Sequence, residues 1–380
     1  MSNKIIALSM FSNVGIAETY FERNGVTVAV ANEVVPERAK FYKHLYPNTK
    51  MICGDIANED VFESVKQEAI NCGVNMIIAT PPCQGMSCAG RKDPDDPRNY
   101  LIYYAIEMIK IIKPKFVLLE NVPMQMHTKI SYKGVKTRIP DYVKAELGDI
   151  YNFNKNNIVN SQNYGVPQSR QRYIMLLTLK DLNFHWEFPE PTSDIITLRE
   201  AIGHLPSLDP LLREEKERWR FPEYEKKAEI GRSVSKWHIP PVHSWRQVEW
   251  MIHTPSGCSA FKNKHYFPCK DGRRIKGAPR TYMRLDWDKP ATTVLQNSGA
   301  ISTFSTVHPG RCIVDSPDDR IRIYSDPRVL TIYELLIVTS LPLDWNIPDW
   351  ASENLIRKVI GEGIPPKLVE SAIINLRKNI

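Results

Sequence analysis

The sequence predicts a doubly wound α/β fold with a mostly parallel sheet, followed by a second, smaller and loop-rich domain. Apolar runs of strand length alternate with helical patterns through the first half of the chain. From about residue 183 prolines become frequent and the alternation disappears. The length of 380 residues also exceeds what one hydrophobic core usually serves, so we expect two domains.

The first unit is expected to be a strand over residues 4–11, a turn, and a helix over 16–25, where apolar residues recur at helical spacing before a glycine. Further strands are expected over 26–34, 49–56, 74–80, 113–121 and 172–179, and helices over 36–46 and 99–112. Residues 354–380 read as two helices around a Gly-Pro turn, which could return to the first domain.

Charge favours a polyanionic partner, because 50 Lys and Arg face 43 Asp and Glu, giving a net charge of +7. Between residues 262 and 284 eight basic residues accompany one acidic residue, with Tyr266, Phe267 and Tyr282 interleaved. This composition suits phosphate contacts and base stacking. A solvated, loop-rich surface is the alternative.

Cysteine usage and hydropathy indicate a reduced, cytoplasmic protein. The seven cysteines have no regular spacing, no signal peptide is recognisable, and no apolar run reaches the roughly 18 residues of a membrane span. A zinc module of His253, Cys258, His265 and Cys269 is conceivable, but it lacks a paired CxxC, so we expect no metal.

Residues able to do chemistry follow the expected strands at their carboxyl ends, which share one edge of a parallel sheet. Gly15 followed by Glu33 suggests a tight turn under a ligand and a carboxylate for ribose hydroxyls, or else a purely structural turn. Asp55 could accept a hydrogen bond from an adenine amino group or cap the next helix.

Cys83 follows two prolines that stiffen a strand end, so it reads either as a presented nucleophile or as a small buried hydrophobe. Glu120 ends another strand and could act as the acid at N3 when a thiolate attacks C6 of a pyrimidine. Arg170 and Arg172 project to the same side of an extended backbone, as part of that pocket or as a surface salt-bridge pair.

Five segments in a fixed order, PPCQ (81–84), ENV (120–122), YGVPQSRQR (164–172), DPRVLTIYELL (326–336) and GEGIPP (361–366), resemble the cytosine-C5 DNA methyltransferases, especially the prokaryotic restriction-modification type. The resemblance covers residues 4–182 and about 284–380. It implies a Rossmann-like, class I S-adenosylmethionine-dependent fold. We expect a catalytic and cofactor-binding domain over 1–182 plus 346–380, and a target-recognition domain and hinge over 183–345.

The resemblance also implies roles. Cys83 would add to C6 of a cytosine flipped out of duplex DNA, with Glu120 at N3 and the amine, Arg172 at O2, and Arg170 ordering the pocket. The implied residues for S-adenosylmethionine are Phe11, Val14, Gly15, Glu33, Asp55, Ile56, Pro82, Leu101 and Glu362. The expected DNA contacts are Gln84, Ser87 and Arg91, in and after the loop that closes over DNA, and Lys262, Lys264, Arg273, Arg274 and Arg280 in the basic stretch.

The chain departs from the family pattern at Ser9, Asn13, Ile16, Asn99 and Glu362, which concerns the cofactor site more than the catalytic set. The cysteine after the prolines argues against amino-group methyltransferases, which use no nucleophile. A tRNA-methylating relative and a DNA-binding relative with a decayed cofactor site stay open. The expected partners are double-stranded DNA and a functionally linked restriction endonuclease; we expect a monomer without membrane contact.

Overall fold

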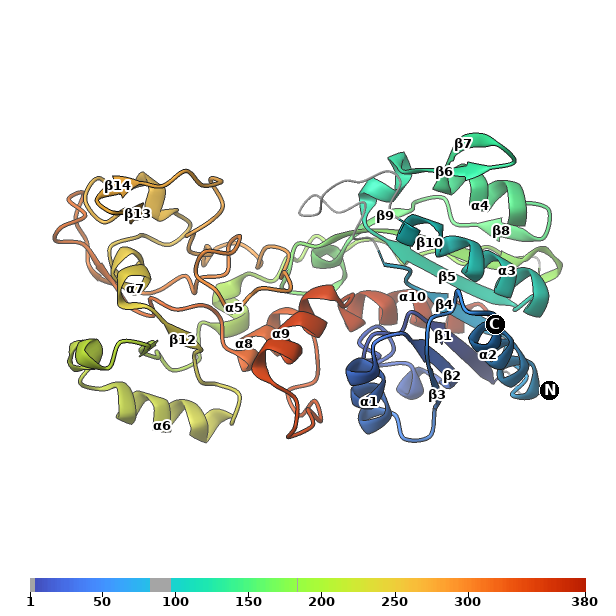
Figure 1. The fold of residues 1–380 in the computed structure, drawn as a ribbon, viewed down its shortest axis with the longest axis horizontal. Helices are drawn as coiled ribbons and strands as arrows, with labels where there is room; N and C mark the ends of the chain where they lie inside the picture. Colours follow the sequence, from blue (N-terminus) through green and yellow to red (C-terminus); the bar gives the residue numbers. More distant parts are fainter. Residues whose placement is uncertain (1–3, 83–96, 183) are drawn as a thin grey trace.

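Two lobes of different texture make up the protein (Figure 1). The computed structural model describes residues 4–82, 97–182 and 184–380. The N-terminal lobe contains a large sheet with helices on both faces, whereas the other lobe consists mainly of loops with short helices and two-stranded ladders. In the described part of the chain, no helix has both the length and the apolar character needed to cross a membrane.

The central sheet has the strand order β3-β2-β1-β4-β5-β10-β8, with β9 also paired to β10. Its first five strands run parallel, and β8, β9 and β10 pair antiparallel at one edge. The strands are β1 (Ile5–Met10), β2 (Val26–Glu33), β3 (Lys50–Cys53), β4 (Met76–Ala79), β5 (Phe116–Asn121), β8 (Tyr151–Phe153), β9 (Ile158–Asn160) and β10 (Gln171–Leu179). The predicted doubly wound, mostly parallel fold is confirmed.

Both faces of the sheet are covered by helices. Because alternate residues of each strand point to opposite sides, every central strand contributes side chains to two separate cores. Leu8 and Ile77 share a core with α2 (Glu59–Asn71), α3 (Ile102–Ile112) and α4 (Ile139–Leu147). Ala7 and Ile78 face the opposite core, formed by α10 (Pro366–Lys378) and the buried Trp186. The last helix therefore returns to the first lobe, as the sequence suggested. The remaining helix of this region is α1 (Pro36–Leu45).

The helix predicted over residues 16–25 is wrong: the segment forms successive turns that end in the 3-10 helix η1 (Glu22–Asn24). Glu18 is buried, and its carboxylate accepts hydrogen bonds from Ser9 and from Tyr42, the latter at 2.6 Å. The Thr19 hydroxyl donates to the Ile16 carbonyl oxygen. These bonds to β1 and α1 favour the turns over a regular helix, a tertiary effect that helical spacing alone does not reveal.

The second lobe is stabilised by buried charges as well as by apolar packing. Arg328 donates to both oxygens of Glu334 at 2.8 and 2.9 Å and to Asp326 at 3.0 Å, with all three side chains fully buried. Arg284 donates to four backbone carbonyls. The elements are α5 (Leu198–Ile202), β11 (Leu211–Leu212), α6 (Tyr224–Val234), β12 (Val242–His243), α7 (Trp245–Ile252), β13 (Cys269–Lys270), β14 (Arg273–Arg274), β15 (Cys312–Val314), β16 (Ile323–Tyr324), α8 (Ile332–Val338) and α9 (Glu353–Glu362).

A mixed apolar core joins the lobes. Val14 and Phe41 from the N-terminal lobe pack in one cluster with Leu285, Leu335 and Ile356. Residues 184–188 pack with the sheet of the first lobe. The exact domain boundaries stay a prediction.

Candidate active site

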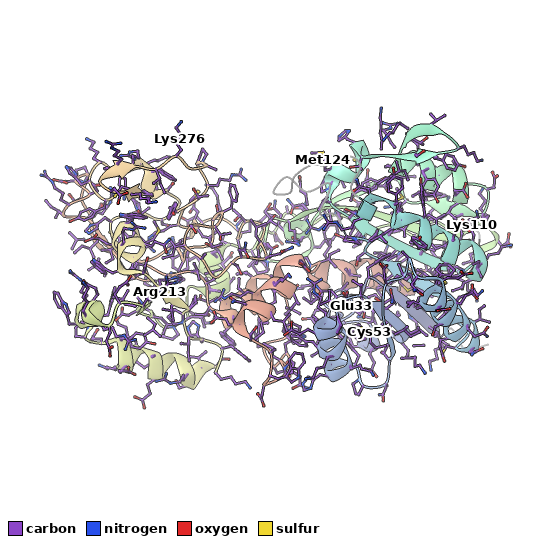
Figure 2. All side chains as sticks on the ribbon, viewed as in Figure 1. Glu33, Cys53, Lys110, Met124, Arg213 and Lys276 are labelled. Atoms are coloured by element: carbon purple, nitrogen blue, oxygen red, sulfur yellow. The ribbon has the colours of Figure 1, made fainter. Side chains whose placement is uncertain are left out.

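The carboxyl ends of the parallel strands β1, β2, β4 and β5 lie along the same edge of the sheet, which is not the edge formed by β8. Side chains there link the loops that follow these strands. The Thr80 hydroxyl donates to the Phe11 carbonyl oxygen at 3.0 Å, and the Asn121 amide donates to the Pro81 carbonyl oxygen at 3.0 Å. Figure 2 labels Glu33 near the same edge. The Pro81-Pro82 strand end, which continues into Cys83, is thereby held beside the end of β5.

A buried ion pair stands at the end of β5. Arg172 Nε lies 2.8 Å from Glu120 Oε1, and both side chains are nearly inaccessible. Because Glu120 is opposite Ile174 in the β5–β10 ladder, Arg172 reaches it diagonally from the same face. Burial raises the pKa of Glu120 above that of a free carboxyl, although Arg172 and Arg170 oppose the shift. The site therefore holds a buried carboxyl group beside a fixed positive charge, next to the Pro81-Pro82 segment.

Arg170 has a different role from Arg172. Its guanidinium donates to the carbonyl oxygens of Val294 and Gly361, both at 2.9 Å, and of Glu362 at 3.3 Å. Arg170 thus joins the start of β10 to two segments far away in the sequence. Both arginines are buried, so the alternative of a surface salt-bridge pair is wrong.

The expected nucleophile Cys83 and the expected DNA contacts Gln84, Ser87 and Arg91 lie outside the described residues. Their roles stay predictions.

The loop after β1 has a strained backbone at the expected cofactor site. Phe11 and Asn13 have positive φ angles of 58° and 52°, and Gly15 has a φ of 79°. The Glu33 carboxylate fixes this loop by accepting hydrogen bonds from the backbone N–H groups of Asn13 at 2.8 Å and Val35 at 2.9 Å. A Cβ on Gly15 would meet the Tyr46 ring at 2.3 Å. The glycine is therefore required by tyrosine packing as well as by the turn.

Two acceptor atoms at this edge have no hydrogen-bond donor among the described residues: Asn13 Oδ1 and Glu362 Oε1, both buried. Asn13 is bound to α9 through the Val359 carbonyl oxygen at 3.2 Å, and Glu362 pairs with Arg38 at 2.6 Å through its other oxygen. Glu362 also raises the pKa of Glu33 in addition to the larger effect of burial. An unsatisfied amide oxygen and an unsatisfied carboxylate oxygen near Glu33 fit a ligand that carries donors or positive charge, such as S-adenosylmethionine.

The other expected cofactor residues are placed differently. Val14 and Ile56 are buried in the apolar clusters, where their side chains contribute to packing. Pro82 and Leu101 are partly exposed near the edge. Asp55 accepts from the Ala57 N–H at 2.9 Å, and Asn58 caps α2 instead, so the capping alternative for Asp55 is wrong.

The basic stretch of the second lobe combines exposed charges with a fixed scaffold. Lys262, Lys264, Arg273 and Arg280 are exposed and form no ion pair within the described parts of the chain. Arg274 instead donates to the Phe261 and Asn263 carbonyl oxygens at 2.6 and 3.1 Å.

The aromatic residues of this stretch pack within the lobe. Tyr266 stacks on His253 with ring centroids 3.7 Å apart, Tyr282 contacts Trp250, and Arg274 covers Phe267 at 3.8 Å. The predicted base stacking therefore has no support from their placement.

The four candidate zinc ligands do not come together. His265, Asp318 and Asp319 are the one set within the described chain whose ligand atoms lie within 4.8 Å of one another. His265 pairs with Asp319 and Asp318 with Arg320, so each group already has a partner.

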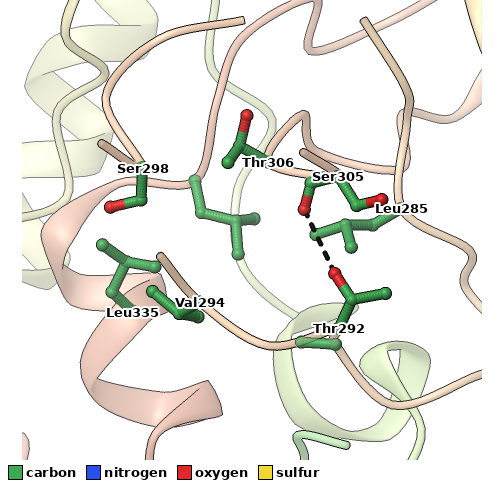
Figure 3. Close-up of a pocket in the computed structure, with 9 residues that line it drawn as sticks. Leu285, Thr292, Val294, Ser298, Ser305, Thr306 and Leu335 are labelled. Atoms are coloured by element: carbon green, nitrogen blue, oxygen red, sulfur yellow. Dashed lines mark hydrogen bonds between the residues drawn. The ribbon is translucent and has the colours of Figure 1, made fainter. Parts of the chain in front are cut away.

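A small cavity is lined entirely by residues from the segment 285–335, among them Leu285, Thr292, Ser298 and Leu335 (Figure 3). Thr292 Oγ1 donates across it to the Ser305 carbonyl oxygen at 3.4 Å. At about 10 Å³ it has room for roughly one water molecule, so it cannot hold the cofactor.

The doubly wound, mostly parallel sheet is that of the class I methyltransferase fold, and the loop after β1 and the Glu120–Arg172 pair lie at the carboxyl ends of its strands. A crystal structure described as a DNA modification methyltransferase encoded within an Escherichia coli prophage matches 99% of both chains with a TM-score of 0.66 at 20% identity, which shows the fold.

The family follows from the sequence comparisons. Residues 5–378 match the C-5 cytosine-specific DNA methylase family. The Type II methyltransferase M1.HgaI of Avibacterium volantium is 40% identical over 98% of both chains. M1.HphI of Haemophilus parahaemolyticus, also a Type II methyltransferase, is 26% identical over 98% of this chain and 87% of its own. The chain belongs to the C-5 cytosine-specific DNA methylase family and is a DNA (cytosine-5-)-methyltransferase. The resemblance to prokaryotic modification enzymes is confirmed.

Three residues that organise the site were not predicted from the sequence. Thr80 and Asn121 hold the loops after β1 and β4 through hydrogen bonds, and Arg38 pairs with Glu362. Arg38 lies in the first turn of α1, and its position five residues after Glu33 is the one sequence feature that could have indicated a role at this site. Its pairing with Glu362 required knowledge of the tertiary fold.

Proposed function

We propose that the protein transfers a methyl group from S-adenosylmethionine to C5 of a cytosine flipped out of a specific duplex DNA sequence. The buried Glu120–Arg172 pair beside the Pro81-Pro82 strand end carries this proposal. By analogy with its relatives, the enzyme would protect host DNA in a restriction-modification system. It would act in the cytoplasm as a monomer, with an endonuclease as a functional rather than physical partner. Residues 183–345 would form the target-recognition domain and hinge.

Each residue of the catalytic set has a distinct task. The Cys83 thiolate forms a bond to C6, while Glu120 holds a proton toward N3 so that negative charge does not build up on the ring. Arg172 keeps the carboxyl oriented and offers a donor to the O2 oxygen. C5 then takes the methyl group, with S-adenosylhomocysteine as the leaving group. A base such as a water molecule takes the C5 proton, the electron pair of that C–H bond restores the 5,6 double bond, and the Sγ–C6 bond breaks to return the Cys83 thiolate. Extrusion of the base is what gives these groups access to it.

The cofactor would be held by the edge of β1, β2 and α9. Glu33 would bind ribose hydroxyls, and the donor-free oxygens of Asn13 and Glu362 would accept hydrogen bonds from the charged methionine part. Bound S-adenosylmethionine supplies an electrophilic methyl group. Asn13 and Glu362, which depart from the family pattern, would therefore support cofactor binding and need not indicate a cofactor site that has lost its function.

Analysis of the modified nucleosides tests this function. The protein is incubated with S-adenosylmethionine and either long duplex DNA or total tRNA, and the nucleosides are identified by mass spectrometry. We expect 5-methyl-2′-deoxycytidine from DNA. Methylation of tRNA alone would establish the RNA alternative, N4-methylcytosine would exclude the covalent route, and DNA binding without product would indicate a decayed enzyme.

A further inference from the structure

The hairpin formed by β6 (Lys129–Tyr132) and β7 (Val135–Arg138) has one face directed inward and one outward. Its register pairs Ile130 with Thr137 and Tyr132 with Val135, so these four side chains share a face. Ile130 is fully buried, and the Tyr132 hydroxyl donates to Glu146 on α4 at 2.6 Å. This inner face fixes the hairpin to the lobe.

The outer face is basic. The register pairs Lys129 with Arg138 and Ser131 with Lys136, so these side chains share the opposite face, and all four residues are exposed. With Lys133 at the turn, residues 129–138 contain four basic and no acidic side chains. Arg138 pairs with Asp141, but both side chains are about half exposed, so the pair contributes little to stability. The outer face is therefore both basic and exposed to solvent.

The hairpin follows the catalytic strand closely. β5 ends in Glu120-Asn121, and the 3-10 helix η3 (Pro123–His127) connects it to β6. Thr128 Oγ1 donates to the Met124 carbonyl oxygen and the Ile139 N–H to the Thr128 carbonyl oxygen, which fastens the base of the hairpin to η3. In Figure 1 this hairpin and the basic β13–β14 hairpin stand at the upper side of their respective lobes.

We propose that the outer face of the β6–β7 hairpin binds backbone phosphates of duplex DNA beside the target cytosine. The inference rests on the proposed function and adds a second region of the catalytic lobe to the DNA contacts expected at residues 84–91 and in the second lobe. Lysine contacts to phosphate carry no sequence information, so the hairpin would contribute affinity and position rather than specificity.

The test compares K129A/K136A with the control K115A/K180A. Lys115 precedes β5 and Lys180 follows the antiparallel β10, so both exposed lysines lie at the opposite edge of the sheet. The Kd for duplex DNA is measured over a range of salt concentrations. We expect K129A/K136A to bind roughly 10-fold more weakly and the slope of log Kd against log salt to fall by about two. K129R/K136R should restore binding, and the control should match wild type.

Three outcomes would overturn the inference. The first is an unchanged Kd and slope in K129A/K136A, and the second is an equal loss in the control. The third is a loss with unchanged salt slope and a lowered unfolding temperature, because it would assign the lysines a structural role. Wild-type protein that fails to bind duplex DNA at all would contradict the proposed function as well, whereas the first three outcomes leave that function standing.

Discussion

At the residue scale, Glu120 is the side chain whose chemistry the structure defines best. Its place at the end of a strand was predicted, because the apolar run before it specifies that strand. Its pairing with Arg172 was not predicted, because that contact depends on the register between β5 and the antiparallel β10. The Arg38–Glu362 pair and the donor-free Asn13 oxygen could not be predicted, since they depend on how α9 packs against the loop after β1.

Glu120→Gln should lower the methyl-transfer rate by about 100-fold or more, because the amide cannot supply the proton at N3. Cofactor binding should stay within a few-fold, because Glu120 is not among the residues expected to contact the cofactor. Single-turnover transfer at saturating DNA and cofactor measures the rate. Glu107→Gln on α3, an exposed carboxylate, is the matched control. A Glu120→Gln enzyme with nearly full activity would remove this residue from the mechanism.

At the element scale, the strands could be predicted because long apolar runs specify them, whereas the segment over 16–25 could not. Its helical spacing was overridden by the hydrogen bonds of Glu18 to Ser9 and Tyr42. The β6–β7 hairpin and the short strands β8 and β9 were also missed, because runs of three or four residues carry too little pattern.

Arg170→Lys tests how β10 is joined to the segment around Val294 and to α9. Lysine keeps the charge but cannot donate to three separate carbonyl groups in this planar arrangement. We expect the free energy of unfolding in urea to fall by about 1–3 kcal/mol. Arg138→Lys, at an exposed ion pair, should leave it nearly unchanged. If the two variants were equally stable, the hydrogen bonds of Arg170 to Val294 and α9 would not contribute to the stability of the fold.

At the scale of the whole molecule, the doubly wound and mostly parallel sheet follows from the alternation of strands and helices, and the sequence was sufficient to predict it. The interior of the second lobe was not predictable. Arg284, Arg328 and Glu334 look like surface residues in the sequence, yet they are fully buried: Arg328 pairs with Glu334, and Arg284 donates to backbone carbonyls of loops distant in sequence.

These buried groups predict how stability depends on pH. Burial lowers the pKa of His308 to about 4 and of His243 to about 3, below the ~6.5 of an unfolded chain. As the pH falls below about 6.5 the unfolded state binds protons first, so stability decreases. Glu18, whose pKa burial raises to about 7, partly offsets this because the folded state retains its proton.

The free energy of unfolding should therefore fall by about 1 kcal/mol for each pH unit between roughly pH 6 and 5. Urea unfolding at a series of pH values measures it. Glu18→Gln should steepen the dependence and His308→Gln should reduce it. A stability that rises on acidification would contradict the neutral state of the two histidines.

The central claim, covalent C5 chemistry at Cys83, is tested most directly by trapping. Duplex DNA of high sequence diversity containing 5-fluorocytosine is incubated with S-adenosylmethionine and either wild-type protein or Cys83→Ala, and the products are separated on a denaturing gel. Fluorine at C5 cannot leave as a proton does, so the enzyme should stay bonded to its DNA. We predict a shifted band for wild type that is absent for Cys83→Ala. A wild type that methylates ordinary DNA yet forms no such band, or a band that persists in the variant, would contradict the claim.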